Sequence, residues 1–351
     1  NFIVLLLGVI RIYENKKTGG TTMKKVLILT AILSAFSLAD DIKELKYNTG
    51  YAGGNLDNSR LQYSQFINEV SGKVSLDDEW KGLMFNFDVS KRNFYDTNQD
   101  AGGDTWDTDF NIMKTQAIGN IDMEWTLGFK YGNSDNMKIG YLDGLIPLKQ
   151  LNGHGYEFYF GPTIAFKIFG QQASFTPRAV YYNDSDKYTR DYKDQGTEGI
   201  GGDFDLAVGG SLAEGRFGGL TYGIQLNNHL RKPTNAKGSG SDKNNSVYLN
   251  YIAILTYSSP RYYGFGFDLN VFNQWEKFTG DEERNNGFYV SPKLLYTHTF
   301  DTKIGKFTVN PYVSYNVVDE QDRQIKYKNK FLDYDGNKEL TGGIQFSLNR
   351  E

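Results

Sequence analysis

Hydrophobic and polar residues alternate along many stretches of this chain. Between residues 121 and 131 every odd position is apolar or aromatic and every even position is polar, apart from one glycine: Ile121, Met123, Trp125, Leu127, Phe129 and Tyr131 against Asp122, Glu124, Thr126, Gly128 and Lys130. Segments 220–227 and 263–271 repeat the pattern. A period of two predicts a β-strand with two unlike faces. Strands of globular proteins usually have ~5–6 residues, whereas a tilted strand that crosses a bilayer needs ~9–11.

The connections between these segments alternate in length. From Asp77 onward the short connections are Asp77–Gly82, Gly119–Asn120, Gly170–Gln172, Ala213–Arg216, Ser258–Arg261 and Asp301–Gly305. The long, polar ones are Asp96–Thr105, Gly132–Gly155, Asn183–Gly202, Arg231–Ser246, Glu276–Asn286 and Asp319–Asn337. Membrane barrels have short periplasmic turns and long outer loops, whereas a soluble sandwich has no reason to sort its loops this way. The sequence therefore predicts an all-β, transmembrane, antiparallel up-and-down β-barrel.

Counting the segments predicts fourteen strands, which places both termini in the periplasm. One strand is expected in Ile42–Ala52 and one ending at Leu76. Twelve follow: Leu83–Tyr95, Trp106–Ile118, Ile121–Tyr131, Tyr156–Phe169, Ala173–Tyr182, Asp203–Leu212, Phe217–Leu230, Val247–Tyr257, Tyr262–Trp275, Gly287–Phe300, Lys306–Val318 and Lys338–Leu348. Segment Gly132–Gly155 leaves two alternatives open. It forms an extra hairpin, which would give sixteen strands, or a loop folded into the lumen as a constriction.

The N-terminal region reads as a targeting segment. Met23-Lys24-Lys25 is a basic start, Val26–Phe36 is apolar and Ser37-Leu38-Ala39 is a small-x-small cleavage site, so residues 23–39 are predicted to be a secretory signal peptide and 40–351 the barrel. Residues 1–22 are interpreted as an upstream over-translation. The apolar run near the start is too short to span a membrane.

Composition agrees with a barrel of the outer membrane of a Gram-negative bacterium. Aromatic residues make up 15% of the chain, yet only 39% is hydrophobic and the mean hydropathy is −0.53, because only one face of each strand has to be apolar. Aromatics at the expected strand ends suit headgroup-level girdles: Trp106, Tyr131, Tyr156, Tyr257, Tyr263 and Trp275. The absence of cysteine fits an envelope protein without disulfides, and the net charge of −4 gives no indication of nucleic-acid binding. No cofactor is indicated.

The alternation also predicts which side chains line the lumen. Twelve charged candidates fall on polar faces: Lys73, Asp88, Asp122, Glu124, Lys130, Glu157, Lys167, Arg178, Asp203, Asp205, Asp268 and Lys293. Five are basic and seven acidic, which favours a passive diffusion pore for ions and small hydrophilic solutes with weak cation preference. A channel for acidic oligosaccharides would need a mostly basic wall.

Two other functions are weighed against a pore. A barrel enzyme needs a histidine beside a nucleophile or carboxylate, and His154, His229 and His298 show no such constellation in the sequence. A surface adhesin or receptor role of the long connections is compatible with a pore.

One segment has the residue spacing of a calcium site. Asp96, Asn98, Asp100, Asp104 and Asp107 have the spacing of an EF-hand loop, but Ala101 stands where glycine is required, so no metal is expected.

The end of the chain carries a short motif. Thr341–Leu348 fits the pattern polar-x-Gly-x-x-φ-x-φ, with Gly343, Phe346 and Leu348 at its defining positions. This pattern resembles the C-terminal signal of outer-membrane barrels, which implies the barrel-assembly machinery as a partner. The chain departs from that class where Asn349-Arg350-Glu351 follow, since the class usually ends on an aromatic residue.

The early region resembles a known family. Arg60-Leu61-Gln62, Val74-Ser75-Leu76 and the segment Leu83–Tyr95 leading into Asp96-Thr97-Asn98 are similar to the fusobacterial major outer-membrane porin (FomA-like). The resemblance implies a monomeric or homotrimeric barrel for nonspecific diffusion, with adhesin roles at the surface, in contact with outer-membrane lipid and lipopolysaccharide. It does not identify a substrate.

Overall fold

The computed structural model describes residues 42–56, 62–76, 82–96, 101–119, 121–141, 146–188, 195–237, 245–279, 284–327, 330–332 and 337–350. The chain divides into two units, residues 1–42 and 43–351, and the second unit contains the sheet. The predicted signal peptide and over-translated segment lie outside the described residues. Within the described part of the chain, no helix is long and apolar enough to cross a membrane.

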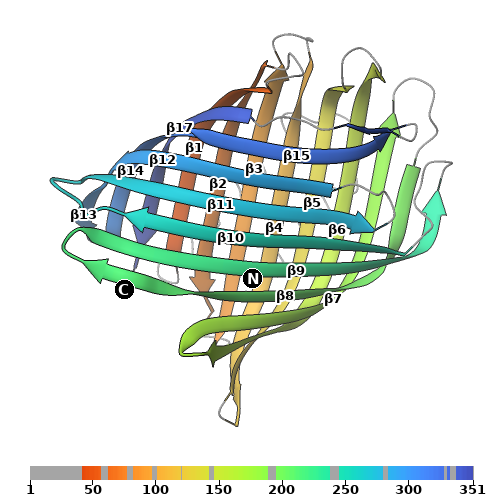
Figure 1. Ribbon diagram of the computed structural model, residues 1–351. Helices are drawn as coiled ribbons and strands as arrows, with labels where there is room; N and C mark the ends of the chain where they lie inside the picture. Colours follow the sequence, from red (N-terminus) through yellow and green to blue (C-terminus); the bar gives the residue numbers. More distant parts are fainter. Residues whose placement is uncertain are drawn as a thin grey trace. The chain divides into compact units, whose positions relative to one another are not determined.

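Every regular element described in the second unit is a β-strand. The strands are β1 Ile42–Leu56, β2 Gln62–Ser75, β3 Leu83–Asp96, β4 Ala101–Ile118, β5 Ile121–Tyr141, β6 Ile146–Ile168, β7 Gln171–Tyr188, β8 Gln195–Gly215, β9 Gly218–Lys237, β10 Ser246–Ser258, β11 Phe265–Thr279, β12 Arg284–Tyr296, β13 His298–Thr302, β14 Gly305–Tyr315, β15 Val318–Tyr327, β16 Lys330–Leu332 and β17 Asn337–Asn349. From β2 to β12, each strand pairs with the next one in an antiparallel ladder (Figure 1).

The sheet closes into a barrel of fourteen strands, as predicted. β12 and β13 run along one side of the strand formed by β14 and β15, so each of these two pairs counts as a single wall strand. β16 pairs with the outer part of β15. β17 closes the barrel, because it pairs with β14 on one side and with β1, the first strand, on the other. Closure leaves no open edge in the wall.

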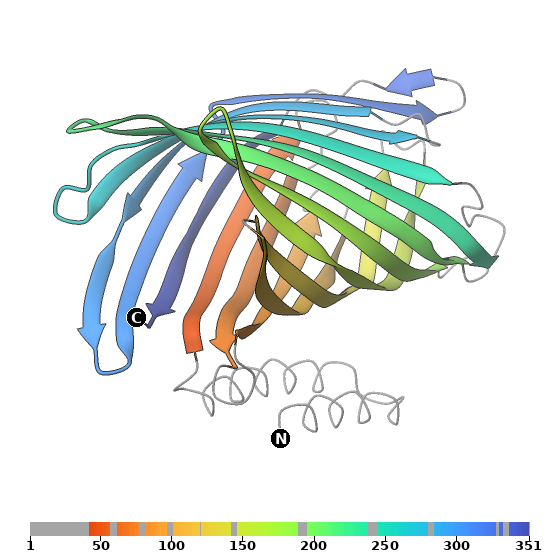
Figure 2. The same cartoon turned by 90° about the horizontal axis from the view of Figure 1, so that it is seen from below.

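The start of β1, the end of β17 and the short turns lie at one end of the barrel. Lys306, which follows the turn between β13 and β14, pairs with Asn349, and Asn349 pairs with Glu44 at the start of β1. Figure 2 shows the C-terminal end of β17 beside this turn. Two-residue connections join β6 to β7 and β8 to β9 at the same end. The predicted sorting of the short connections to one end is therefore confirmed.

The predicted long loops are wrong in large part, because strands continue into them. β7 extends to Tyr188 and β8 starts at Gln195, so ladder pairs such as Asn183↔Glu198 occupy much of the expected loop Asn183–Gly202. β9 likewise runs through Arg231 to Lys237. β4 to β9 have 18 to 23 residues each, about twice what a bilayer requires.

Of the two alternatives for Gly132–Gly155, the structure has the hairpin, but not as two additional strands of the wall. Met137 pairs with Leu151 and Tyr141 pairs with Ile146, after an irregularity that follows Ser134. The segment therefore prolongs β5 and β6 outward as one hairpin. It adds no strands to the wall, so the count of sixteen does not apply, and it does not fold back as a separate loop into the lumen.

The two faces of the wall differ as the alternation predicts. On β5 the Leu127 side chain is 57% exposed, whereas the adjacent Thr126 is 3% exposed. Large apolar side chains with similarly wide exposure lie on the face of Leu127 in other strands, among them Phe158, Phe160, Ile224 and Leu294. Side chains splay apart on the convex face of a closed sheet and crowd on the concave face. The polar face is therefore the inner one.

Candidate functional site

The candidate site is the charged inner face of β3 to β9. Residues directly opposite each other in a ladder share a face of the sheet, so the register can be followed from strand to strand. It leads from Asp88 to Asp109, on to Lys130 and Glu157, and then to Tyr182. Residues two positions apart on one strand lie on the same face. The same procedure places all twelve candidates from the sequence on the inner face: Lys73, Asp88, Asp122, Glu124, Lys130, Glu157, Lys167, Arg178, Asp203, Asp205, Asp268 and Lys293.

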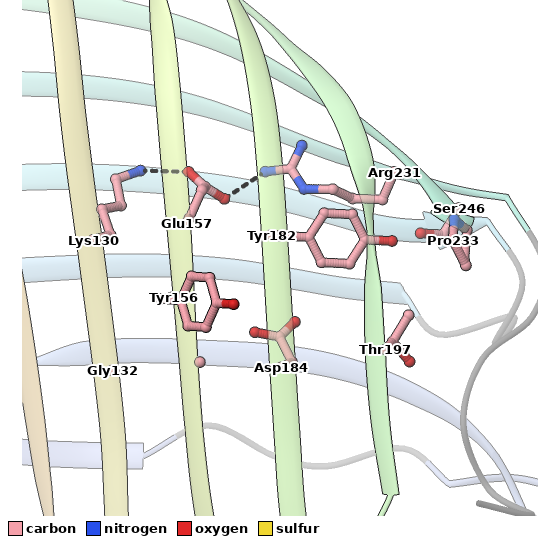
Figure 3. Close-up of a pocket in the computed structure, with 11 residues that line it drawn as sticks. Lys130, Gly132, Tyr156, Glu157, Tyr182, Asp184, Thr197, Arg231, Pro233 and Ser246 are labelled. Atoms are coloured by element: carbon pink, nitrogen blue, oxygen red, sulfur yellow. Dashed lines mark hydrogen bonds and ion pairs between the residues drawn. The ribbon is translucent and has the colours of Figure 1, made fainter. Parts of the chain in front are cut away.

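Arg231 is the centre of the strongest cluster. Its Nη1 atom lies 2.6 Å from Oδ1 of Asp203, and its Nη2 atom lies 3.0 Å from Oε2 of Glu157. The other carboxylate oxygen of Glu157 lies 3.3 Å from Nζ of Lys130. Figure 3 shows this row of alternating charge running from β5 through β6 to β9. Asp203 is almost fully buried, so its charge depends on the guanidinium for compensation.

The reach of Arg231 supports the assignment of the inner face. Glu157 is on β6 and Arg231 on β9, so the ion pair passes over two intervening strands, a distance of about 14 Å along the wall at the usual strand spacing. Inward-pointing side chains converge and can close such a distance. The guanidinium passes over the ring of Tyr182, with its Cζ 5.8 Å from the ring centroid. A Cβ at Gly201, opposite Arg231, would lie 2.2 Å from the backbone oxygen of Leu230 and 3.0 Å from Cδ of Arg231, so glycine lets both the β9 backbone and the arginine come close.

Tyr159 joins this cluster to the acidic side chains of β4. Its hydroxyl donates to Oδ1 of Asp109 at 2.7 Å, across β5. The ring can lie over β5 because residue 128 is glycine, where a Cβ would come within 2.1 Å of the ring. Lys130 and Arg178 place their cationic groups 5.0 and 4.8 Å from its centroid. Tyr159 is only 3% exposed, so the wall is tightly packed here.

Next to the cluster lies a pocket of about 530 Å³. Lys130, Glu157, Tyr182 and Arg231 line one side of it, together with Asp184 of β7 and Thr197 of β8 (Figure 3). The pocket offers both cationic and anionic groups that are already paired with each other. It therefore suits water and small polar solutes, and it carries no excess of positive charge for an acidic chain.

Several predicted residues lie apart from this cluster. Oδ1 of Asp268, on β11, lies 3.0 Å from Nη2 of Arg261 in the preceding turn. Nζ of Lys293 lies 4.4 Å from the ring centroid of Tyr312. Lys73 approaches Glu44 at 3.9 Å. Asp122, Glu124 and Lys167 lie on the inner face near the short turns, at the other end from the pocket.

Sequence reasoning missed three members of the cluster: Asp109, Tyr159 and Arg231. The inner-face position of Asp109 and Tyr159 could have been predicted, because each lies two residues from another inner-face side chain. Arg231 falls in polar sequence that reads as a long loop, so the alternation gives it no face. Continuing β9 by two residues beyond His229 would have placed it correctly.

His229 is the inner-face histidine for which a carboxylate partner is seen among the described residues. Its Nε2 lies 3.2 Å from Oδ1 of Asp205, and its ring lies 5.6 Å from that of Tyr248. The Tyr248 hydroxyl donates to Glu276. His298 lies on the outer face, against Phe300. The pair of His229 and Asp205 is a histidine–carboxylate contact that the sequence analysis did not expect. Within the described chain, no serine or threonine hydroxyl is hydrogen-bonded to His229.

The residues with EF-hand spacing do not form one continuous loop in the structure. Asn98 and Asp100 lie outside the described residues, but β4 already begins at Ala101. Asp104 and Asp107 therefore point to opposite faces of a strand and cannot converge on one ion. Asp104 is held by Lys91 at 3.2 Å. In the part of the chain that the structure describes, no group of three acidic or histidine side chains is placed to hold a metal.

Comparison with known proteins identifies no family for this chain. No protein-family model matches it, and no curated protein does. Among solved structures it is similar to a FadL homologue from Pseudomonas aeruginosa, with 7% identity, a TM-score of 0.45 and coverage of 89% of this chain and 92% of the other. It is also similar to an anion-selective porin from Comamonas acidovorans, with 9% identity, a TM-score of 0.35 and coverage of 88% and 98%. Likeness at this level carries no argument about function, and the resemblance to the fusobacterial porin stays a prediction.

Proposed function

We propose that this protein is a porin of the Gram-negative outer membrane that lets ions and small hydrophilic solutes diffuse passively through a water-filled barrel. One observation carries the proposal. A closed fourteen-stranded wall exposes large apolar side chains on its outer face and gathers charged, partly exposed side chains on its inner face. A wall of this kind is stable in lipid and wettable inside.

The proposed selectivity is a weak preference for cations. Among the twelve candidates on the inner face, acidic residues exceed basic ones by two. The cluster that the sequence missed adds Asp109 and Arg231, which leave that difference unchanged. Much of the charge is compensated within the wall by ion pairs, so the residual field is small. A small acidic excess favours cations without excluding anions.

The proposed partners follow from the same reading. Outer-membrane lipid and lipopolysaccharide would cover the apolar face. The barrel-assembly machinery would recognise the last strand, where Gly343 faces inward and Phe346 and Leu348 face outward; Phe346 packs between Tyr47 and Phe307 at centroid distances of 6.2 Å each. A homotrimer is one proposed assembly. A surface adhesin or receptor role is the second candidate function, favoured by the long extensions of β5 to β9.

Reconstitution tests the pore directly. Purified, folded protein in a planar bilayer is expected to give steady, ohmic current steps, and a salt gradient is expected to give a reversal potential of modest cation sign. Vesicles that contain the protein should also release a small sugar faster than empty vesicles. Folded protein that inserts but carries no current would reject the pore and favour the adhesin or receptor.

A further inference from the structure

The short turns at the terminal end of the barrel carry an unusual set of exposed apolar side chains. Five of the turns at this end present at least one such side chain at or beside the tip. Together these side chains form a group that we call the turn rim: Ile118 and Ile121, Phe169, Phe217, Tyr262 and Tyr263, and Ile304. Phe169 is 100% exposed, Tyr263 97% and Phe217 72%. Ile304, in the turn between β13 and β14, is also exposed.

The rim is not explained by turn geometry. Phe169-Gly170 and Tyr263-Gly264 form two-residue turns in which all four residues have positive φ, at 50° and 81° and at 50° and 88°. This conformation favours Asn-Gly or Gly-Gly, and a bulky aromatic residue at the first position is disfavoured. Both turns therefore carry a ring at a strained position, where the ring makes almost no contact with the protein itself. A side chain that conflicts with local preference and projects outward indicates a partner.

The rim is continuous with the apolar outer face of the wall. Phe265 lies next to the Tyr263-Gly264 turn and packs on Tyr296, with ring centroids 4.9 Å apart. Phe300, on the strand leading to Ile304, packs on Phe307 at 6.4 Å. Apolar surface therefore passes without interruption from the lipid-facing strands onto the turns.

Basic side chains accompany the rim. Arg216 precedes Phe217 and holds its guanidinium carbon 4.5 Å from the ring centroid, and Lys303 precedes Ile304. An apolar tip beside a cation matches the boundary between acyl chains and phosphate headgroups, where long basic side chains reach the phosphate.

We infer that the turn rim is immersed in the headgroup–acyl boundary of a phospholipid monolayer, so that the barrel ends inside the membrane interface at this end and does not project into water. The inference rests on the proposed function, because it requires a lipid-embedded barrel. It adds that the turns themselves are lipid anchors. The rings of Phe169, Phe217 and Tyr263 are buried by lipid, and Arg216 and Lys303 contact phosphate.

The absence of cysteine in this chain gives a clean test. Phe169→Cys and Tyr263→Cys carry an environment-sensitive fluorophore at the rim. Asn235→Cys, exposed at the far end of β9, is the water control, and Leu294→Cys, on the outer face of β12, is the lipid control. Each labelled protein is placed in phosphatidylethanolamine–phosphatidylglycerol vesicles, with nitroxide lipids or aqueous iodide as quencher. At both rim positions, a nitroxide placed shallowly in the lipid is expected to quench the label at least twice as strongly as it quenches the Asn235 label. Iodide is expected to quench the rim labels correspondingly less.

The controls separate the two proposals. If the Leu294 label is quenched by nitroxide lipid while the rim labels behave like Asn235, the rim inference is wrong and the membrane barrel stands. If the Leu294 label is not quenched either, the proposed membrane barrel fails as well.

A second measurement avoids the fluorophore. Phe169→Asn with Tyr263→Asn gives both turns their preferred chemistry. A solvated rim would then leave the urea midpoint in vesicles unchanged or higher. An immersed rim is expected to give a lower midpoint, because two lipid contacts are lost. A midpoint that is unchanged or raised overturns the inference.

Discussion

At the scale of single residues, glycine decides where large side chains can lie on the inner wall. Tyr159 reaches Asp109 only because Gly128 has no side chain beneath the ring, and Arg231 crosses toward Glu157 over Gly201. Glycine normally weakens a strand. Here the loss of strand stability at glycine is offset by the contacts of Tyr159 and Arg231, whose flat side chains lie over the strands and interact with several charged or polar groups each.

The Gly128 position gives the first prediction. Gly128→Ala places a methyl group within 2.1 Å of the Tyr159 ring, which must move away from Asp109. Overpacking of this kind costs about 1–3 kcal/mol, so the urea midpoint of the folded barrel should fall. Gly223→Ala is the matched control, because it lies on the same inner face with no atom within 4 Å of the added Cβ. Equal midpoints for the two variants would show that Tyr159 does not rest on Gly128.

Arg231 gives the second prediction. Arg231→Met removes the guanidinium that compensates nearly buried Asp203, and it leaves Glu157 with Lys130 as its remaining partner. Loss of one partner of a fully buried ion pair costs about 3–5 kcal/mol. The partial exposure of Arg231 and Glu157 reduces that to about 1–3 kcal/mol here. The salt-gradient reversal potential should also shift toward cations, since one positive charge is lost from the inner wall and Asp203 is left without its guanidinium partner.

Lys232→Met serves as its control. Lys232 is the next residue on β9 and is exposed on the opposite face. It removes the same charge without touching the cluster, so neither stability nor reversal potential should change. A shift of similar size in both variants would contradict a specific role of Arg231.

At the scale of the elements, the sequence predicted faces better than it predicted ends. The alternation in Ile121–Tyr131 places every one of these residues on the side where the structure has it. The ends of β7 and β9 were missed for a physical reason. Alternation arises where one face meets lipid and the other meets water. Beyond the bilayer both faces are wet, so residues such as Asn183 and Arg231 sit in polar sequence that reads as a loop although the backbone continues its ladder.

The cluster on the inner face was partly predictable for the same reason. Lys130, Glu157, Arg178 and Asp203 were found because they lie in the alternating parts of their strands. Which of them touch was not predictable, since this depends on the stagger between strands and on glycines that clear the path of Tyr159 and Arg231.

The third prediction tests the two faces of one strand. Ile224 is exposed on the outer face of β9, and Gln225 beside it is exposed on the inner face at nearly the same depth. Ile224→Arg places a charge in hydrocarbon, at a cost of about 2–4 kcal/mol near the bilayer midplane. Gln225→Arg keeps its charge in the wet lumen. Heat-modifiability on a gel and urea unfolding in vesicles should show loss of folded barrel for the first variant only, and equal loss would mean that the faces are misassigned.

At the scale of the whole molecule, the barrel has two unlike ends. The short turns, the start of β1 and the end of β17 lie at one end, and the extensions of β4 to β9 rise well above the other. The proposed orientation places the extensions outside the cell, because short turns are periplasmic in bacterial barrels.

Protease treatment of intact cells tests this orientation as the fourth prediction. Cleavage is expected between β7 and β8 or between β15 and β17, and Ser258–Arg261 should be spared. Cells with a permeabilised outer membrane serve as the control in which the short turns also become accessible. Cuts confined to the short turns in intact cells would reverse the barrel.

The ion preference of the whole pore gives the last prediction. Glu124 lies on the inner face, whereas Glu320 is exposed on the outer face of β15, opposite Phe288. Glu124→Gln and Glu320→Gln remove one negative charge each, but only the first removes it from the proposed ion path. The reversal potential in a salt gradient should move toward anions for Glu124→Gln, further when Asp122→Asn is added, and not at all for Glu320→Gln. Low salt should enlarge the shift, since screening by ions weakens the field of a wall charge over about 10 Å at 0.1 M. A shift of equal size in Glu320→Gln would mean that the selectivity arises from total charge and not from the inner wall.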